Sequence, residues 1–149
     1  MHGTCVLVSG IGVLLRGESG SGKSDVALRL IDGGARLVAD DQVLLHVENG
    51  RLIASAPDSL AGLLEVRGVG ILPVPSVPSA MVGLLVDLVP HDRVERLPDA
   101  ACERLLAIPV PHLALPPFDA ATPAKLRLAA AAAKAGTLGA VPAAMTAFP

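Results

Sequence analysis

The sequence predicts a single α/β domain, in which a mixed β-sheet carries one helix near the N-terminus and a second near the C-terminus. A strand-like apolar run, a glycine-rich loop and an amphipathic helix follow one another from Val13 to Ile31. Short apolar runs separated by turn residues continue to Val89, a pattern typical of strands. Thr122-Pro123 has the form of a helix start, with Thr122 as N-cap and proline in the first helical position, and this helix should reach about Ala135.

We take residues 1–149 as one domain, because a chain of 149 residues can bury roughly two thirds of its unfolded surface in one core. The segment 136–149 is weakly patterned and is expected to fray. Hydrophobic residues make up 52% of the chain, mostly Ala, Val and Leu, so its surface should carry more apolar area than a monomer usually shows. Self-association into a homo-oligomer is therefore expected.

Composition argues against two classes of partner. The net charge is −2 and the chain has neither Trp nor Tyr, which leaves no basic stripe and little base-stacking surface for nucleic acid. No signal peptide precedes the first strand and no run of 18 apolar residues occurs, so we expect a cytoplasmic protein without a membrane partner. Cys5 and Cys102 have no metal-ligand spacing and are expected to stay reduced.

The expected strands occupy most of the first 90 residues. They are 4–8, 11–16, 36–41, 43–48, 51–55, 63–66, 67–72 and 81–89. Ser9-Gly10 and Asn49-Gly50 are the expected hairpin turns. Two glycines within 67–72 indicate a close approach of that backbone to another group. Three prolines from Pro73 to Pro78 predict a stiff, exposed and poorly ordered loop, and the proline-rich stretch 108–123 should not be helical.

The glycine-rich loop carries the strongest functional pattern. Two glycines separated by four residues precede Lys and then Ser, which is the pattern of a phosphate-binding loop, or P-loop. Glycines let successive backbone N–H groups point at phosphate oxygens. Lys23 would add a charge at the β- and γ-phosphates, the Ser24 hydroxyl could bind Mg²⁺, and the helix N-terminus favours an anion. The predicted nucleotide-binding residues are Gly17, Glu18, Ser19, Gly20, Ser21, Gly22, Lys23 and Ser24.

The alternative is that this loop is an ordinary Gly/Ser-rich turn. The four fixed positions match by chance in roughly one chain in 200 of this length. The context also favours a P-loop, because an apolar strand precedes it and the apolar stripe of a helix follows it up to Gly33-Gly34. Strand, loop and helix are the structure that phosphate binding requires.

Two carboxylates end the next apolar strand. Asp40 and Asp41 follow the short run that begins at Arg36. In a parallel sheet the carboxyl ends of strands meet at one edge, and the P-loop lies at such an edge. Either aspartate is therefore expected near the phosphates, although helix-capping or turn aspartates would give the same sequence.

Three segments together resemble the catalytic domain of the bifunctional HPr kinase/phosphorylase. They are the P-loop, the Leu-Val-Ala-Asp-Asp stretch that ends at Asp41, and Glu-Val-Arg-Gly-Val-Gly-Ile-Leu from Glu65, which is similar to the signature sequence of that family. The resemblance covers roughly residues 2–100. It implies an ATP-dependent or pyrophosphate-dependent kinase that phosphorylates a serine of the phosphocarrier HPr and so regulates carbohydrate metabolism. It also implies a hexamer.

The resemblance assigns roles position by position. Asp41 falls on the catalytic base, and Ser24 and Glu65 fall on the Mg²⁺ positions. His2, which spacing alone would leave as a solvated terminus, falls on an active-site histidine. A catalytic arginine corresponds to Arg96, with Arg93 as the alternative, and we favour Arg96 because leucine follows it as in the family pattern. Lys23 completes the expected catalytic set, since it and Mg²⁺ would neutralise charge on the transferring phosphoryl group.

Two departures from the family pattern are visible. The usual N-terminal domain does not precede His2, so the chain resembles a short form of the catalytic core. The Arg-Pro-Gly-Arg-type segment that is linked to dephosphorylation is not recognisable, and the matching region, 108–116, contains neither Arg nor Lys. We therefore expect a kinase with weak or no phosphorylase activity. Two other interpretations are a nucleotide-sensing module without catalysis and a different P-loop kinase or ATPase.

Overall fold

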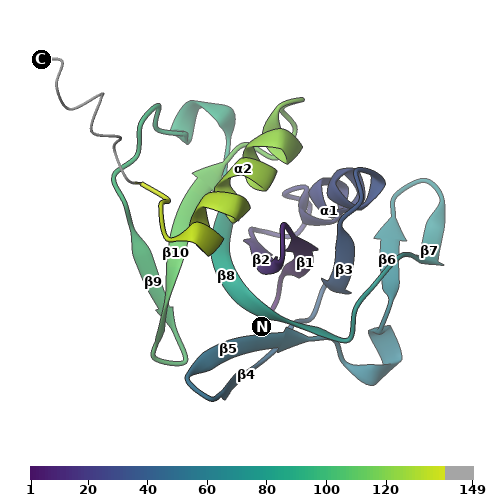
Figure 1. The fold of residues 1–149 in the computed structure, drawn as a ribbon. Coiled ribbons are helices and arrows are strands. Elements are labelled where there is room, and N and C mark those ends of the chain that lie inside the picture. The colour runs from purple at the N-terminus through teal and green to yellow at the C-terminus, as the bar shows by residue number, and fades with distance from the viewer. Residues whose placement is uncertain (140–149) are drawn as a thin grey trace, which may run out of the picture.

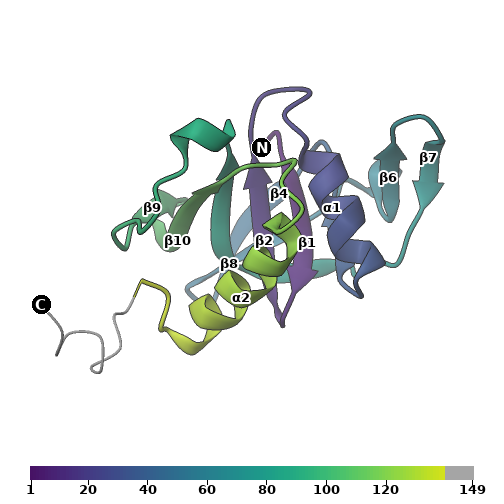
Figure 2. The same cartoon turned by 90° about the horizontal axis from the view of Figure 1, so that it is seen from above.

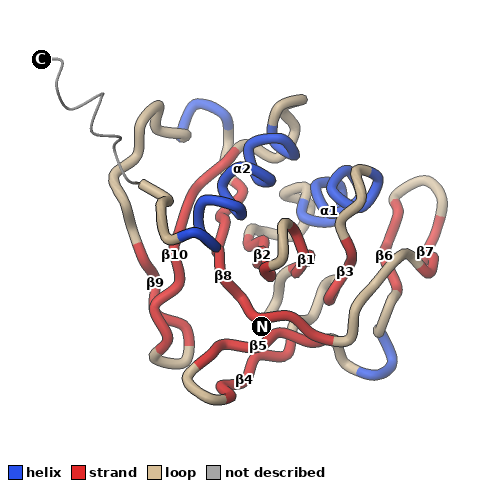
Figure 3. The backbone as a smooth tube through the Cα atoms, viewed as in Figure 1, coloured by secondary structure: helices blue, strands red, loops and turns tan. Residues whose placement is uncertain are grey.

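The computed structural model describes residues 1–139, and ten strands and two α-helices lie in this part of the chain (Figure 1). The strands are β1 (Thr4–Val8), β2 (Ile11–Arg16), β3 (Arg36–Ala39), β4 (Leu44–Glu48), β5 (Arg51–Ser55), β6 (Leu63–Val66), β7 (Gly70–Pro73), β8 (Ser79–Leu88), β9 (Cys102–Leu105) and β10 (Ile108–Leu115). The α-helices are α1 (Lys23–Asp32) and α2 (Thr122–Ala135), and two 3₁₀ turns are η1 (Asp58–Leu60) and η2 (His91–Arg93). Figure 3 shows that strands dominate the fold.

The main sheet has the strand order β3-β1-β2-β8-β10-β9 and is mixed. β1 is antiparallel to both β2 and β3, whereas β8 is parallel to both β2 and β10. The long strand β8 also pairs through its first residues with β5, which forms a hairpin with β4. β6 and β7 form a separate hairpin beside α1 (Figure 2). This architecture confirms the expected mixed α/β sheet with a helix after the P-loop and a C-terminal helix.

The two helices pack on one face of the sheet, and the β4–β5 hairpin lies on the other side (Figures 1 and 2). Side chains alternate between these faces along each strand. In β2, Val13 and Leu15 join the core under the helices, whereas Leu14 joins the core on the opposite face. All three side chains are fully buried. Each such burial contributes about 1.5–3 kcal/mol, so both cores hold β2 and the loop that follows it in place.

Three local expectations were wrong. Gly68 lies in the β6–β7 turn and Gly70 is the first residue of β7; their φ values are 87° and 132°, and a Cβ at either would meet nothing within 4 Å. They serve the turn and not a close backbone approach. The proline segment after β7 is ordered by pairing with β3, because Leu37 donates to Pro75 O and accepts from the Val77 N–H. Thr122 is the first helical residue and not the N-cap, and its buried hydroxyl donates to Pro116 O.

The strands β9 and β10 were missed, although the stretch 108–123 is indeed not helical. Pro109 and Pro111 lie in the half of β10 that pairs only with β9, and the half from His112 onward pairs with β8. Proline is tolerated in a strand where no ladder hydrogen bond needs its missing N–H. In the expected frayed segment, Thr137 N–H bonds to Ala132 O and Leu138 packs against the core, while 140–149 lie outside the described residues.

Within residues 1–139, no helix is long and apolar enough to cross a lipid bilayer. Cys5 is buried, which raises the pKa of its thiol to about 12, and Cys102 is exposed on β9. Both cysteines are free.

Candidate functional site

The P-loop lies between the end of β2 and the start of α1. Gly20 and Gly22 have φ of 80° and 100°, a region that other residues rarely adopt. The loop is closed by a hydrogen bond of 2.9 Å from Ser21 N to Glu18 O. α1 begins at Lys23, and its first amide groups therefore face the loop. The local structure is the strand, loop and helix that the sequence predicted.

Lys23 is buried against the loop that precedes it. Its Nζ donates to Gly17 O at 2.7 Å and to Glu18 O at 3.0 Å, and the residue is 8% exposed. These bonds hold the ammonium group inside the curve of the loop. A cation in this position faces the same space as the loop amides, which is the arrangement that binds phosphate.

Asp40 is the buried carboxylate of the site. Its Oδ1 accepts hydrogen bonds of 2.9 Å from both Thr4 Oγ1 and Ser24 Oγ, and its Oδ2 accepts one of 3.2 Å from Glu65 N. Three separate elements (β1, α1 and β6) therefore hold this side chain. Although β3 is not adjacent to β2, both strands run in the same direction because each is antiparallel to β1. Their carboxyl ends consequently meet beside the P-loop.

Asp41 has different surroundings from its neighbour. Its side chain is 65% exposed and its φ is 68°, at the centre of a tight turn that Gln42 N closes onto Asp40 O at 2.8 Å. Such a turn is strained in a residue other than glycine, and strained backbone is found preferentially at functional sites. The turn directs the Asp41 carboxylate away from the core and into the open part of the site.

His2 lies next to Asp41. The segment around it pairs with the chain after β3, since Gly3 N donates to Asp41 O and Val43 N donates to Met1 O. The imidazole Nδ1 is 3.6 Å from Asp41 Oδ1. The structure therefore places His2 beside Asp41, a contact that the sequence did not indicate.

A pocket of about 270 Å³ connects these groups. Glu65 and Arg67, from β6 and the turn after it, also line the pocket, and both are exposed. The residues that line the pocket are His2, Thr4, Ser19, Gly20, Gly22, Lys23, Ser24, Asp25, Leu28, Asp40, Asp41, Glu65, Val66, Arg67 and Phe118. Most of the expected site residues are thus brought together.

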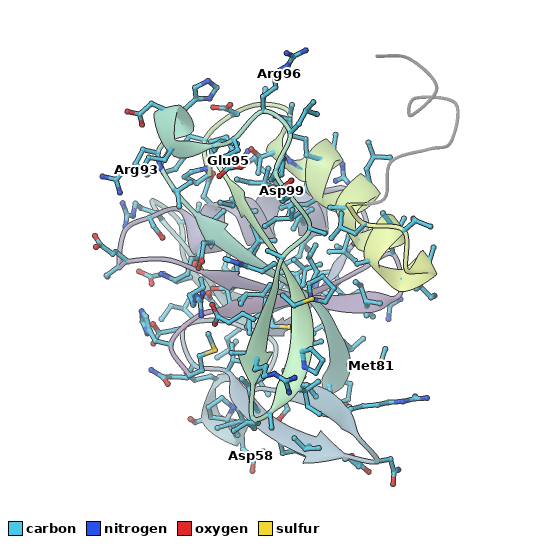
Figure 4. All side chains as sticks on the ribbon, turned by 90° about the vertical axis from the view of Figure 1, so that its left-hand side faces the viewer. Asp58, Met81, Arg93, Glu95, Arg96 and Asp99 are labelled. Atoms are coloured by element: carbon cyan, nitrogen blue, oxygen red, sulfur yellow. The ribbon has the colours of Figure 1, made fainter. Side chains whose placement is uncertain are left out.

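The two candidate arginines do not line this pocket. Arg93 lies in η2 and Arg96 in the loop after it. Figure 4 shows Arg96 pointing outward at the edge of the molecule, with Arg93 on the other side of the same segment. The assignment of Arg96, with Arg93 as the alternative, as the catalytic arginine stays a prediction.

The donor set suits Mg²⁺. Ser24, Asp40 and Glu65 offer a hydroxyl and two carboxylates, and oxygen ligands are those that Mg²⁺ prefers. Within residues 1–139, no group of three or more His, Cys, Asp or Glu side chains is arranged to hold a metal ion by itself. Mg²⁺ at nucleotide sites takes only one or two protein carboxylates together with phosphate oxygens and water, so these residues fit a metal that arrives with a nucleotide.

An ion-pair network is centred on Arg16, the last residue of β2, directly before the P-loop. Arg16 donates to Asp87 Oδ1 at 2.7 Å and to Glu103 Oε1 at 2.8 Å, and His112 Nε2 lies 2.7 Å from Asp87 Oδ2. The hydrogen bonds from Arg16 are the main cause that lowers the pKa of both carboxyl groups, and the carboxylates in turn raise the pKa of Arg16. The network ties β2 to β8, β9 and β10 at the point where the loop begins.

Comparison with known proteins places the chain in a family. The family model described as the HPr serine kinase C-terminal domain matches residues 1–141. The chain belongs to this family. Its curated relatives include the HPr kinase/phosphorylase of Clostridium tetani, which is 56% identical over 77 residues, or 52% of this chain and 25% of that protein. Another is the HPr kinase/phosphorylase of Limosilactobacillus reuteri, which is 37% identical over 128 residues, or 78% of this chain and 40% of that protein.

A solved structure of this family has the same fold. The HPr(Ser) kinase/phosphatase from Coxiella burnetii matches with a TM-score of 0.77 and 32% identity, over 86% of each chain. The chain spans between a quarter and two fifths of the length of the two curated relatives above. The family resemblance that the sequence suggested is therefore confirmed for the kinase domain.

Sequence reasoning missed two features of the pocket. The resemblance assigned a role to Asp41 but none to Asp40, and only the structure shows that Asp40 is bonded to Ser24. Sequence reasoning also gave no weight to Phe118, whose ring lies at the pocket beside the P-loop. No local pattern marks either residue, because both features depend on contacts between distant segments.

Proposed function

We propose that this chain is an ATP-dependent serine protein kinase that transfers the γ-phosphoryl group of ATP to a serine of an HPr-type phosphocarrier, with Mg²⁺ as cofactor. The observation that carries the proposal is that Asp40 and Asp41, both beside the P-loop, differ in burial and in hydrogen bonding. One carboxylate is buried and bonded to Ser24, and the next is exposed in the same pocket. A nucleotide-binding fold without transfer has no need for the second.

The P-loop and Lys23 would bind the triphosphate. The loop glycines expose backbone amides, α1 presents its positive end, and Lys23 Nζ is already held among them. These charges would lie against the oxygens on which negative charge is spread during transfer. Because the groups are fixed by the fold, little reorganisation accompanies the reaction.

Ser24, Asp40 and Glu65 are the residues that would hold Mg²⁺. When bound, the metal ion would supply positive charge that offsets the negative charge of the phosphates during transfer. The chain's own contribution is orientation: the buried Asp40 carboxylate fixes the Ser24 hydroxyl through a hydrogen bond of 2.9 Å. Thr4 and the Glu65 amide fix Asp40 in turn.

Asp41 would accept the proton of the substrate serine. A serine hydroxyl is not ionised at neutral pH, so a base must take its proton as the oxygen attacks phosphorus. The Asp41 side chain is 65% exposed, whereas Asp40 is 6% exposed and is bonded to Ser24, on the side of the site where Mg²⁺ would bind. His2, whose Nδ1 lies 3.6 Å from Asp41 Oδ1, would orient the Asp41 carboxylate.

The proposal is tested by incubating the purified protein with Mg²⁺, γ-labelled ATP and an HPr-type carrier, and by locating the label after digestion. Label on one serine of the carrier is the expected result. A carrier whose acceptor serine is replaced by alanine is the matched control and should remain unlabelled. ATP binding without any transfer would contradict the kinase and support a nucleotide-sensing module.

A further inference from the structure

We propose that Phe118 is the nucleobase contact of the site, so that a nucleotide lies across the P-loop with its base on the β10 side and its terminal phosphate on the β3 side. This inference rests on the proposed function, because it assumes a nucleoside triphosphate in the pocket. It adds a residue for which the P-loop motif provides no role.

Phe118 is an exposed aromatic side chain in an unusual place. The sequence has two Phe and neither Trp nor Tyr, and Phe118 is the Phe within the described residues. It is 68% exposed and lines the pocket instead of joining either core. A large apolar ring in such a position needs another partner to be shielded from water.

The ring lies against the last glycine of the P-loop. A Cβ placed at Gly22 would be 3.0 Å from both Cε1 and Cζ of Phe118 and 2.9 Å from Cβ of Pro117. Figure 2 shows the segment between β10 and α2 passing beside the first turn of α1. Glycine at this position therefore serves two purposes, since it supplies the φ of 100° and leaves room for the ring.

The loop that carries Phe118 is held rigidly. Arg29 of α1 donates to the carbonyl groups on both sides of it, Pro117 O and Asp119 O. Asp25 pairs with Arg29 at 3.0 Å and fixes the guanidinium group. His91 Nδ1 lies 2.7 Å from the Asp119 carboxylate and ties the loop to η2. A ring on a fixed backbone loses little conformational freedom when a ligand stacks on it.

The charge distribution of the pocket decides the orientation of the nucleotide. β3 and β10 lie on opposite sides of β2 in the sheet. The β3 side contributes Asp40 and Asp41, and Glu65 lies with them. Carboxylates suit a metal ion and a proton transfer, whereas an uncharged base fits the apolar ring on the other side. The reverse orientation would place the terminal phosphate at Phe118, away from every candidate base.

The test compares MgATP with magnesium tripolyphosphate, which has the phosphates without a base, by calorimetric titration of the full chain. Phe118→Ala should weaken MgATP binding roughly five- to 150-fold, the range that corresponds to about 1–3 kcal/mol for the loss of one stacking aromatic. Binding of tripolyphosphate should change less than about twofold. Phe118→Trp should restore ATP affinity, and Phe118→Leu, which keeps apolar area without a π face, should restore less of it. The affinity for MgGTP should fall as much as the affinity for MgATP, because stacking on a ring does not distinguish the hydrogen-bonding groups of the two bases.

Leu128→Ala is the matched control, because Leu128 is 74% exposed on α2 and does not line the pocket. It should change neither affinity. Equal loss of ATP and tripolyphosphate binding in Phe118→Ala, or unchanged ATP affinity, would overturn the base contact while leaving the proposed kinase standing. A change only in the KM for the carrier would likewise overturn it and assign Phe118 to the protein substrate. Failure of the wild-type protein to bind either ligand would overturn the proposed function and this inference with it.

Discussion

Asp40 and Asp41 are adjacent in the chain, but the turn at the end of β3 directs their side chains into different surroundings. The tight turn at Asp41 reverses the direction of the backbone, so one side chain enters the packed region under α1 and the other faces the pocket. Burial and three donors specify Asp40 as a positioning group, and exposure leaves Asp41 free to meet a substrate. A single-residue shift in the end of β3 would exchange these roles.

Lys23→Ala tests the binding half of the site at the residue scale. Removal of the ammonium group should weaken MgATP binding roughly ten- to a hundredfold, because a hydrogen bond to a charged group contributes about 1.5–3 kcal/mol. The free energy of unfolding should change by less than about 1 kcal/mol, since the two acceptors of Lys23 belong to Gly17 and Glu18, loop residues that are half-exposed and exposed. Calorimetry measures the affinity for MgATP, and thermal unfolding measures the change in stability. Lys134→Ala, on the exposed side of α2, is the control and should bind MgATP like the wild type. Full MgATP binding by Lys23→Ala would contradict a role of the P-loop in the mechanism.

Residue-level prediction from the sequence succeeded where the pattern is local. The P-loop residues were found because their spacing alone encodes the loop. The local pattern placed both carboxylates near the loop, and only the resemblance singled out Asp41; the role of Asp40 was not predicted, because its donors include groups from β1 and β6. Phe118 gave no signal, since its contact with Gly22 joins segments almost a hundred residues apart.

At the scale of elements, β2 is fixed at its carboxyl end by charge as well as by packing. Arg16 is its last residue and reaches β8 and β9 through Asp87 and Glu103. Gly17, the first residue of the P-loop and the acceptor for Lys23, follows directly. The network therefore supports the loop from the side opposite the helices.

The Arg16 network predicts a specific acid sensitivity. The folded protein holds Asp87 with a pKa below its ordinary value of 3.8, so near that pH the unfolded chain binds a proton that the folded chain does not. Asp87 therefore contributes stability above pH 3.8, and this contribution is lost as the pH falls through the lowered pKa of the folded state. The midpoint of thermal unfolding should fall more steeply below pH 4 in wild-type protein than in Asp87→Asn.

The matched control for this experiment is Asp58→Asn, at the exposed start of η1, which should leave the wild-type slope unchanged. Circular dichroism between about pH 3 and pH 6 gives the midpoints. Parallel pH curves for wild-type and Asp87→Asn would show that the network does not stabilise the fold.

Element prediction was best for the hairpins with tight turns. β1–β2 and β4–β5 appear at the expected residues because Ser9-Gly10 and Asn49-Gly50 specify reversal locally. β9 and β10 were missed because proline is a poor strand residue by propensity. Its presence in β10 is explained by partners that only the assembled sheet provides. The strand order itself has no local signal.

At the scale of the whole molecule, the sheet sets the direction in which the site faces. β2, β3 and β10 all end at one edge, and the segments after them supply the P-loop, the carboxylates and Phe118. α1 closes the same edge from one side and the β6–β7 hairpin adds Glu65 and Arg67. The proposed carrier would therefore approach from the side where Asp41 and His2 are exposed.

The same architecture predicts that transfer runs mainly forward. Reversal requires inorganic phosphate to be held in line with a phosphoserine, and two such anions repel unless cations compensate. The region 108–116 has no Arg or Lys and forms β10 instead of a flexible loop. Arg127 lies against Gly33 at the far end of α1 from the P-loop, so Lys125 is the remaining substitute of these two downstream cations.

Dephosphorylation is measured with phosphoserine carrier, Mg²⁺ and inorganic phosphate, by following pyrophosphate release. The rate should be at least about tenfold below that of the forward reaction, in line with the loss of one compensating charge. A reverse rate equal to the forward rate would refute this prediction. Lys125→Ala would then show whether that lysine supplies the anion site.

The central claim is that binding and proton acceptance are divided between neighbouring carboxylates, and the transfer rate of Asp41→Asn tests it most directly. Asparagine keeps the size of the side chain and tolerates the left-handed backbone at this position, but it cannot accept the serine proton. Single-turnover transfer from ATP to the carrier should fall roughly 10²–10⁴-fold, while the Kd for MgATP stays within about twofold of wild type. Asp40→Asn, in contrast, should weaken MgATP binding. Transfer by Asp41→Asn at the wild-type rate, or a larger loss of transfer in Asp40→Asn with unchanged MgATP affinity, would contradict the account.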